Sequence, residues 1–362
     1  MQALAAFIAD SPDIAMTAGG LLIGALFGSL AQQTNYCTMG AISDWRLSGN
    51  LNRLGAVALA AAVAILGAQA LDAYGVTDLS KSIYLSPRIN WLGALAGGMI
   101  FGAGMVYAGG CPSRTLIRAG GGDMRGVFSL AVMAITAYAT ISGVLSGLRV
   151  GIDSATAIDL KRHAATSQGL DDLLALAGLQ PETARWSAAL LTAVPLLAFA
   201  FGKAGVLAAP RNLVAGVAVG GLAVAGWALT GMAVDDFAVV PVQPASLSFV
   251  KPVGDAIDWL ERSTALGLPG FGAASVFGVV AGALVSSWMS GTARLAGFAD
   301  RGDVLRHLLG GIAMGFGGVM ALGCTIGQGV TGISTLAVQS LIACSAIVLG
   351  AVLALKRLER DL

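Results

Sequence analysis

Charged residues are scarce in this 362-residue chain, and the residues that commonly bind metals are scarcer still. Asp, Glu, Lys and Arg together make up 11% of the sequence, which contains two histidines. No Cys-x-x-Cys or His-x-x-x-His spacing occurs, and this argues against a zinc site. A phosphate-binding loop and a recognisable catalytic triad are also missing. We therefore expect no metal and no cofactor.

Apolar residues dominate instead, and they are grouped in long runs. They make up 56% of the chain, and the mean hydropathy is +0.80. Because a spanning helix needs about 20 apolar residues, the sequence predicts one transmembrane domain, residues 1–362, that is all-α. The expected spans are residues 14–33, 52–74, 90–109, 125–147, 185–202, 211–232, 270–291, 304–323 and 332–354.

The basic residues between these spans predict the orientation. If the N-terminus lies outside, most Lys and Arg residues fall on inner segments. Basic residues concentrate on the cytoplasmic side of membrane proteins, so we expect a periplasmic N-terminus and a cytoplasmic C-terminus. Residues 1–13 lack the basic start of a cleavable signal. The expected location is a bacterial inner membrane.

Two segments, residues 148–184 and 233–268, are too polar to span a membrane and fall outside in this topology. We interpret them as solvated connectors, with an acidic outer rim as the functional alternative. Within them, residues 172–179 and 255–262 predict short amphipathic helices on the outer face.

Glycine is abundant, with 51 residues, and some of these glycines belong to an internal repeat. Residues 97–111 align without a gap with residues 310–324, which superposes five glycines and one cysteine. The segment GLLIGAL at residues 20–26 resembles GVVAGAL at residues 278–284. Small residues let membrane helices approach closely, so we interpret the stripe of Gly20, Gly24 and Gly28 as a helix contact.

The topology gives the repeat a direction. The span before Cys111 runs inward, whereas the span before Cys324 runs outward. The approximate halves, residues 14–147 and 270–354, are then inverted repeats, as in many transporters, and residues 148–269 connect them. Cys37 has no partner in this alignment.

Three cysteines follow glycine-rich apolar segments. Cys37 lies in NYCTMG, Cys111 in GGCPSR and Cys324 in GCTIGQG, and polar or glycine-rich residues come next. These residues predict short re-entrant helices that line a cavity. Pro112 suits the first position of such a helix and leaves Cys111 as its cap. The free N–H groups of a helix N-terminus favour an anion.

Each cysteine has a simpler interpretation as a small buried hydrophobic residue. We assign Cys344, in the middle of an apolar segment, to packing, and we interpret Cys37, Cys111 and Cys324 as a path for a small anion with a soft atom. Cys324 is expected to approach from the outer side and Cys111 and Cys37 from the inner side, which argues against a disulfide as a simple structural staple.

Neighbouring residues are candidate supports for this path. Arg114 and Arg118 either attract an anion at the inner exit or simply satisfy the positive-inside rule. Gly110 and Gly323 are candidates as the turn glycines before two of the cysteines. The hydrogen-bond donors beside the cysteines are candidates too, and helix capping is the alternative role of those beside Cys37: Thr325, Gln328, Thr331, Asn35, Tyr36 and Thr38.

The segments NYCTMGAISDW, GGCPSRTLIRAGGGD and GCTIGQGVTGIS resemble the YeeE/YedE family of bacterial inner-membrane proteins, whose members include thiosulfate transporters. The resemblance covers roughly residues 15–354 and implies an hourglass of about nine spanning helices plus re-entrant ones. It also implies that thiosulfate enters from the periplasm and meets Cys324, then Cys111 and Cys37. A small cytoplasmic sulfur-carrier protein of the TusA type is an implied partner.

The chemistry of thiosulfate suits such a path. Its terminal sulfur is a soft acceptor, and a neutral thiol donates a weak S–H hydrogen bond to it. Weak successive sites favour conduction, so we expect a transporter and not an enzyme. Two alternatives stay open: a permease for another sulfur or selenium species, and a membrane sulfur-transfer or thiol-redox enzyme.

Overall fold

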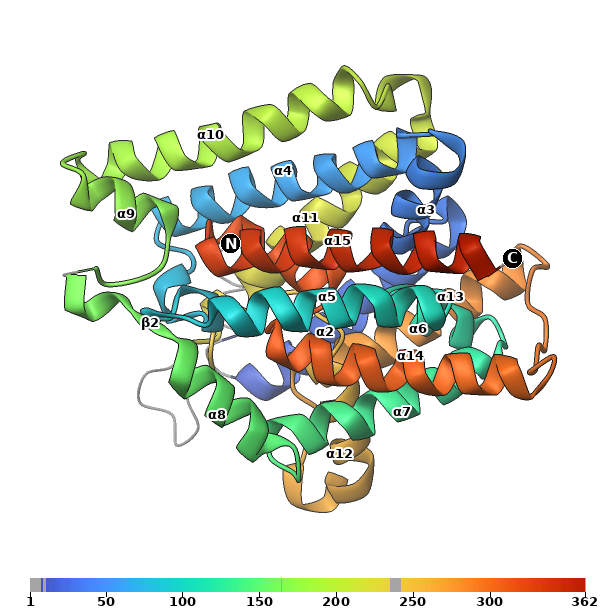
Figure 1. Cartoon of the computed structure of the whole chain (residues 1–362). Helices are drawn as coiled ribbons and strands as arrows, with labels where there is room; N and C mark the ends of the chain where they lie inside the picture. The colour runs from blue at the N-terminus through green and yellow to red at the C-terminus, as the bar shows by residue number, and fades with distance from the viewer. Residues whose placement is uncertain (1–7, 9–10, 164, 235–241, 362) are drawn as a thin grey trace.

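The computed structural model describes residues 8, 11–163, 165–234 and 242–361. The described part consists largely of helices, and its two strands have two residues each. The long helices run roughly parallel to one another across the view of Figure 1, and the C-terminus lies at the right-hand end. The prediction of an all-α integral membrane fold is confirmed.

Eight segments of the described residues are long and apolar enough to cross a membrane. Their long helices are α2 (Pro12–Thr34), α4 (Asn52–Ala73), α5 (Trp91–Tyr107), α7 (Met124–Ile141), α10 (Pro181–Phe201), α11 (Pro210–Met232), α13 (Phe271–Met289) and α15 (Val338–Asp361). Helix α14 (Arg301–Met320) occupies the remaining expected span, but Arg301, Asp303 and Arg306 lower the hydropathy of its first turns.

Shorter elements connect these helices. The short α-helices are α3 (Thr38–Ser48), α6 (Pro112–Gly120), α8 (Ser146–Thr156), α9 (Leu170–Leu176) and α12 (Lys251–Leu266). The 3₁₀ turns are Leu79–Lys81, Ile83–Leu85, Leu160–His163 and Val206–Ala208, and a π-helical turn covers Gly327–Gly332. Strands β1 (Arg88–Ile89) and β2 (Ile158–Asp159) pair antiparallel, with Arg88 opposite Asp159.

Proline and glycine explain where several helices begin and end. Pro12, Pro112 and Pro210 stand at helix starts, where the missing N–H costs nothing. Helix α10 continues through Pro195, so the span that contained an internal proline forms as predicted. Helix α7 ends at Ile141, six residues before the predicted boundary, and a glycine follows two residues later.

Close glycine contacts hold the central helices together. A Cβ at Gly104 of α5 would lie 2.9 Å from the Gly310 carbonyl oxygen of α14, and a Cβ at Gly310 would lie 2.8 Å from the Gly104 carbonyl oxygen. Neither position has room for a side chain. Helices α2 and α13 also pack through glycine, with Gly24 against Ser275 and Gly28 against Val279. The predicted helix contact of this stripe is confirmed.

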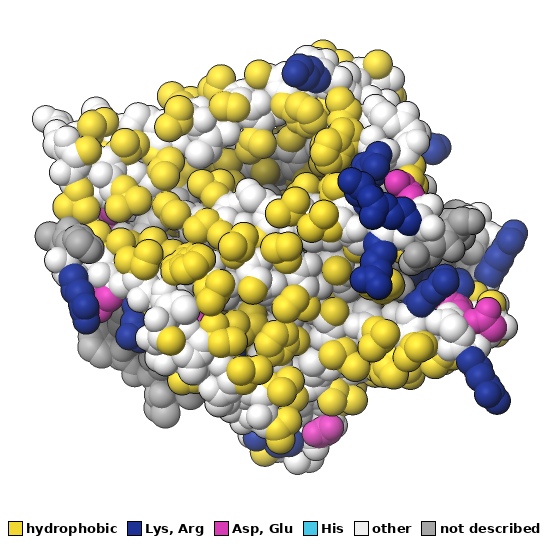
Figure 2. Space-filling model, viewed as in Figure 1, with side chains coloured by type: hydrophobic (Ala, Val, Ile, Leu, Met, Phe, Trp, Pro, Cys, Tyr) yellow, Lys and Arg dark blue, Asp and Glu magenta, His cyan; other side chains and the backbone are white. Residues whose placement is uncertain are grey.

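The surface matches a protein surrounded by lipid. Figure 2 shows hydrophobic side chains spread over the face in view, with Lys and Arg gathered toward the end at which α15 finishes. On α15 itself, Leu349 and Leu353 are about half exposed (47% and 49%). The next turns of the same helix carry basic residues. An apolar band that ends in basic residues is the pattern expected of a membrane helix.

The segment before α12 corrects one prediction. We expected residues 233–268 to be a solvated outer connector or rim, but Leu247, Phe249 and Val250 are 0%, 0% and 2% exposed. Phe249 packs against Phe27 of α2 with ring centroids 5.3 Å apart. Burial of these large apolar side chains outweighs the polarity of their neighbours in the sequence. Residues 235–241 of the segment lie outside the described residues.

Candidate functional site

The three motif cysteines all stand at the start of a short helix. Cys37 is the N-cap of α3, and its sulfur accepts a hydrogen bond from the Gly40 amide at 3.4 Å. Cys111 is the N-cap of α6, with Pro112 in the first turn as predicted. The sulfur of Cys324 accepts a hydrogen bond from the Gly327 amide at 3.3 Å. The free N–H groups of three helix starts therefore surround the sulfur atoms.

The structure brings two of these cysteines into direct contact. The Sγ atoms of Cys37 and Cys111 lie 3.7 Å apart, although 74 residues separate them in the sequence. Cys111 Sγ also lies 3.2 Å from the Ser113 hydroxyl. All four cysteines of the chain are free, and Cys111 and Cys324 are fully buried. A distance of 3.7 Å fits an S–H···S hydrogen bond and is far longer than a disulfide bond.

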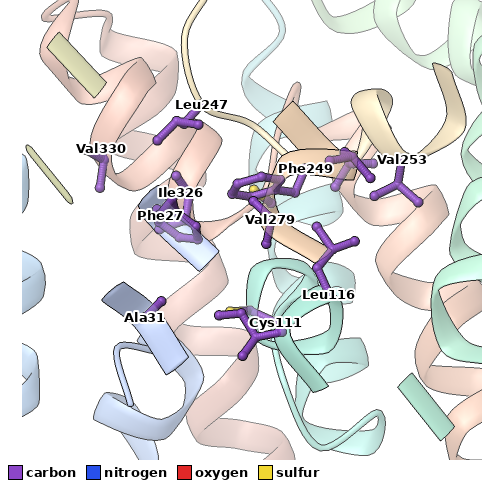
Figure 3. Close-up of a cluster of buried hydrophobic side chains, with 14 of the residues drawn as sticks. Phe27, Ala31, Cys111, Leu116, Leu247, Phe249, Val253, Val279, Ile326 and Val330 are labelled. Carbon is purple, nitrogen blue, oxygen red and sulfur yellow. The ribbon is translucent and has the colours of Figure 1, made fainter. Parts of the chain in front are cut away.

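An apolar cluster encloses the thiols. Cys37, Cys111 and Cys324 all belong to the same buried core. Figure 3 shows Phe27 and Ile326 on one side of this cluster, Phe249 above Cys111, and Leu116 beside it. Phe249 and Phe27 come from segments that are far apart in the sequence. The cysteines thus lie in a closed hydrophobic centre.

Several buried polar atoms near the cysteines have no hydrogen-bond partner among the described residues. They include the hydroxyl groups of Tyr36, Thr38 and Thr325, and Nη1 of Arg114. Tyr36 and Thr38 flank Cys37, and Thr325 follows Cys324. A buried polar group without a partner costs roughly 1–3 kcal/mol. Such a group of unused donors around the sulfur atoms is what an anion-binding site requires.

Asn35 connects the two inner cysteine motifs. It ends α2 in the left-handed conformation, with φ of 55°. Its side-chain oxygen accepts from Arg114 at 3.2 Å, and its carbonyl oxygen accepts from Arg53 at 2.7 Å. Asn35 therefore aligns the chain that leads into Cys37 with the helix that follows Cys111. Arg53 also pairs with Asp44 at 2.9 Å. The sequence did not single out Arg53 as a site residue, because the backbone carbonyl group of Asn35 is a partner that no motif marks.

The polar residues after Cys324 are largely used within the protein. The Gln328 amide donates to the Ala321 carbonyl oxygen at 2.6 Å, and the Thr331 hydroxyl donates to the Leu247 carbonyl oxygen at 2.7 Å. Both side chains are buried. Gln328 holds the π-helical turn to the end of α14, and Thr331 holds it to the segment before α12. Turns of this kind often occur at functional sites. Thr325 is the residue of this group whose hydroxyl stays available.

The turn glycines leave room for the helices that follow them. A Cβ at Gly110 would lie 3.3 Å from the Arg114 side chain, and a Cβ at Gly323 would lie 3.3 Å from the Gln328 side chain. Both contacts are tight. Each glycine therefore lets the first turn of the next helix fold back close to its cysteine. Ser113, which contacts the Cys111 thiol, is a site residue that the sequence did not single out, although it lies two positions after that cysteine.

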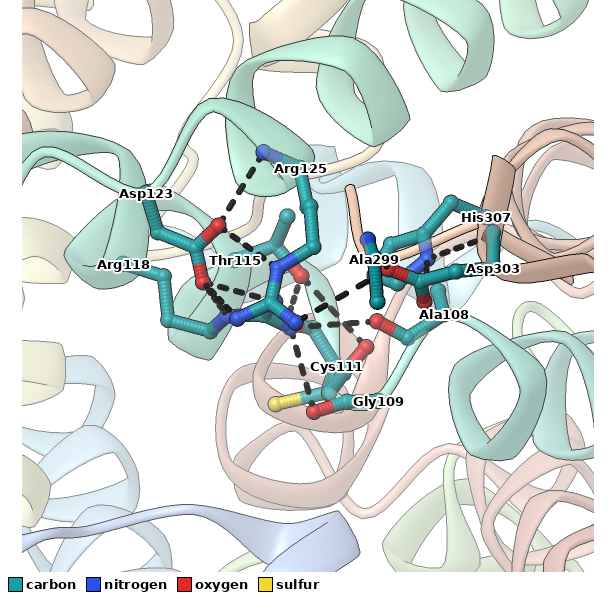
Figure 4. A network of polar contacts seen from close by, with 11 residues as sticks. Ala108, Gly109, Cys111, Thr115, Arg118, Asp123, Arg125, Ala299, Asp303 and His307 are labelled. Carbon is teal, nitrogen blue, oxygen red and sulfur yellow. Dashed lines mark hydrogen bonds and ion pairs between the residues drawn. The ribbon is translucent and has the colours of Figure 1, made fainter. Parts of the chain in front are cut away.

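Arg118 is engaged in a network rather than in the cysteine cluster (Figure 4). It forms an ion pair with Asp123 at 2.8 Å and donates to the Ala108 carbonyl oxygen at 3.1 Å. Arg125 also pairs with Asp123, at 3.0 Å, and lies 3.9 Å from Asp303 of α14. The network therefore ties the end of α5, the helix capped by Cys111 and the start of α14 into one unit.

The network predicts a pH-dependent stability. Burial alone would raise the pKa of Asp123, but hydrogen bonds and charge from Arg125 and Arg118 lower it to about 2. This contribution to stability is complete above the ordinary aspartate value of 3.8 and is lost as the pH falls toward about 2. We expect Asp123→Asn to lower the free energy of unfolding by roughly 1–3 kcal/mol at neutral pH.

Thermal unfolding of the purified protein in detergent tests this expectation. The difference between wild type and Asp123→Asn should shrink as the pH falls toward the lowered pKa. Glu261→Gln is the control, because Glu261 is exposed and makes no ion pair among the described residues. A difference between wild type and Asp123→Asn that stays constant over this range would exclude the ion pairs as its cause.

Comparisons with known proteins find relatives that are named as transporters. The thiosulfate transporter TsuA of Escherichia coli (strain K12) is 26% identical over 320 residues, which are 87% of this chain and 86% of that protein. TsuA of Spirochaeta thermophila is 26% identical over 351 residues, 91% of this chain and 96% of that protein. The probable transporter YedE of Salmonella typhimurium is 33% identical over 101 residues, 27% and 23% of the two chains.

The family described as sulphur transport matches residues 33–353, which include all three motif cysteines and the spans from α4 onward, apart from the last turns of α15. Almost all of α2 precedes the matched residues. Helical architecture, cysteine motifs and family match agree in identifying the chain. It belongs to the sulphur transport family, the YeeE/YedE family that its motifs resemble.

Proposed function

We propose that this protein carries thiosulfate across a bacterial inner membrane along Cys324, Cys111 and Cys37. The observation that carries the proposal is the 3.7 Å contact between the sulfur atoms of Cys37 and Cys111, buried at two helix N-termini. The names of two relatives that match most of the chain support thiosulfate as the substrate. Neither a metal nor a cofactor enters the mechanism.

The donors around the thiols suit both ends of the thiosulfate ion. Neutral thiols donate weak hydrogen bonds to the terminal sulfur of the substrate. The unpartnered hydroxyl groups of Tyr36, Thr38 and Thr325 would donate to its oxygen atoms. The helix N-termini add favourable potential for a dianion without carrying a full charge. Because each contact is weak, the substrate can leave one site for the next.

We propose that two inverted halves bring the cysteines together from opposite sides. The mutual contact of Gly104 and Gly310 supports this, because it recurs between Gly317 and Gly97, the positions that the repeat aligns with them, as a twofold axis between α5 and α14 requires. The proposed orientation has a periplasmic N-terminus and a cytoplasmic C-terminus, so that the basic end of α15 faces the cytoplasm. A TusA-type sulfur carrier would receive the substrate on that side.

A thiol-redox activity is the second candidate. The same 3.7 Å contact places two thiols close enough to form a disulfide after a small movement. Such an enzyme would pass through a disulfide or a cysteine persulfide. Mass spectrometry of the cysteines during turnover separates the candidates, because transport along neutral thiols leaves every cysteine unmodified.

Uptake into proteoliposomes tests the proposed function. We expect the purified protein to take up ³⁵S-labelled thiosulfate well above protein-free vesicles. Unlabelled thiosulfate should compete strongly and sulfate at the same concentration much more weakly, because sulfate has no soft sulfur atom for the thiols. If sulfate inhibits uptake as strongly as unlabelled thiosulfate does, the proposed role of the thiols is contradicted. No uptake would point to another substrate, with selenium species as the first alternatives to test.

A further inference from the structure

A charged pocket lies beside the network that holds the Cys111 helix. It has a volume of about 340 Å³ and opens between the end of α5, the start of α7, the start of α14 and the end of α15. Arg118, Arg125, Arg306 and His307 line it, together with Asp303. Figure 4 shows Arg118 and Arg125 converging on Asp123, with Asp303 and His307 on the opposite side. The proposed transport path does not use this pocket.

Positive charge exceeds negative charge in this group. Arg118 and Arg125 share Asp123, and Arg125 also lies near Asp303. Arg306 makes no ion pair among the described residues. Three guanidinium groups thus face two carboxylates, even when His307 is neutral. The pocket has one cation that no protein group balances.

His307 provides an unused nitrogen atom. Its Nδ1 lies 2.9 Å from the Asp303 carbonyl oxygen and 3.2 Å from the Asp303 carboxylate. The side chain is 7% exposed, and Nε2 is buried without a partner among the described residues. Phe298 packs edge-on against the ring and fixes it, with centroids 5.6 Å apart. Because Nδ1 faces two acceptor oxygens, it carries the proton of the neutral ring, and Nε2 donates to an anion only in the doubly protonated imidazolium. A buried imidazolium nitrogen in the same pocket as the unpaired guanidinium group of Arg306 suits an anionic ligand.

The internal repeat shows that these charges are not needed to start the helix. Extending the alignment of residues 310–324 with residues 97–111 toward the N-terminus places Arg306 opposite Gly93 and His307 opposite Ala94. Helix α5 begins normally with these small residues. The charged group therefore occurs at only one of the two corresponding helix starts.

The pocket also adjoins the proposed path. Gly109 lines it, two residues before Cys111, and the Gly109 carbonyl oxygen lies 3.4 Å from Nη1 of Arg118. We propose that the pocket is a second oxyanion-binding site, which holds the substrate by its oxygen atoms through Arg306 and His307 after it leaves the thiols. This step rests on the proposed function for the identity of the substrate.

The two kinds of site differ in what they select. Thiols favour the soft sulfur of thiosulfate, whereas guanidinium and imidazole N–H groups favour hard oxygen atoms. The pocket should therefore bind sulfate as well as thiosulfate, although the thiols pass only the latter. Sulfate is thus a suitable probe of the pocket, and variants of its lining residues separate sulfate bound there from sulfate bound elsewhere.

Equilibrium dialysis of ³⁵S-labelled sulfate against the purified full-length protein at low ionic strength tests the proposal. We expect saturable binding at one site, weakened roughly tenfold or more in Arg306→Gln and in His307→Gln by loss of a charge-assisted hydrogen bond. Arg301→Gln is the matched control, since Arg301 is an exposed basic residue of the same helix outside the pocket. It should bind sulfate like wild type.

Two results would overturn the second site: wild-type protein that binds no sulfate, or equal binding by Arg306→Gln and Arg301→Gln. Because Arg306 is exposed, Arg306→Gln should fold normally, and it therefore stays informative if His307→Gln fails to fold. Failure of thiosulfate uptake would leave sulfate binding intact, so the dialysis result is separate from the test of the proposed function.

Discussion

Cys111→Ala should reduce thiosulfate uptake at least about tenfold, to near the level of protein-free vesicles. Cys111 touches both Cys37 and the Ser113 hydroxyl, so its loss would interrupt the proposed path at its centre. Loss of one hydrogen bond that acts during passage is worth about 1 kcal/mol, which is roughly fivefold in rate, and the Cys111 thiol makes two such contacts. The empty space left beside Cys37 adds to this effect. Uptake of labelled thiosulfate at matched protein amounts measures the change.

Cys111→Ser distinguishes a soft contact from a simple donor. Serine keeps a hydroxyl donor at nearly the same position, but its oxygen is hard. If softness matters, Cys111→Ser should lose most of the uptake that Cys111→Ala loses. Cys344→Ala is the control, because Cys344 lies inside α15 and was assigned to packing. Uptake by Cys111→Ala at the wild-type level would mean that the cysteine cluster is a packing feature.

The spans could be predicted from the sequence because lipid imposes a simple rule. Every backbone group in the bilayer must be satisfied within a helix, so long apolar runs identify the spans directly. The charged first turns of α14 blur this signal, yet its glycines align with those of α5 and place it correctly. Pro112 likewise identified the start of α6 and the capping position of Cys111.

The contact between Cys37 and Cys111 could not be predicted in the same way. Cys37 has no partner in the repeat, and nothing in the sequence relates α3 to α6. The buried stretch around Phe249 was missed because its apolar residues form too short a run between polar neighbours to count as a span. Arg114 and Arg118 both follow Cys111 on the short helix α6, so the sequence alone does not distinguish their roles. Their neighbours in space separate them: Arg114 contacts Asn35, whereas Arg118 pairs with Asp123.

Gly310→Leu should destabilise the folded protein more than any other single glycine change that we consider. A Cβ at Gly310 would lie 2.6 Å from the Ala108 amide nitrogen and 2.8 Å from the Gly104 carbonyl oxygen, and backbone cannot move away as a side chain can. Overpacking of this kind costs roughly 1–3 kcal/mol or more. We expect a lower unfolding temperature in detergent and a smaller monodisperse fraction.

Gly221→Leu is the matched control, because Gly221 also lies within a long helix but has open space where its Cβ would be. It should leave stability unchanged or raise it slightly, since leucine favours a helix more than glycine does. Gly104→Leu should resemble Gly310→Leu, because each glycine faces the carbonyl oxygen of the other. The double variant should cost less than the sum, since the first leucine already forces α5 and α14 apart. Strict additivity would show that the two glycines do not share one contact, and the mutual packing that supports the inverted halves would be lost.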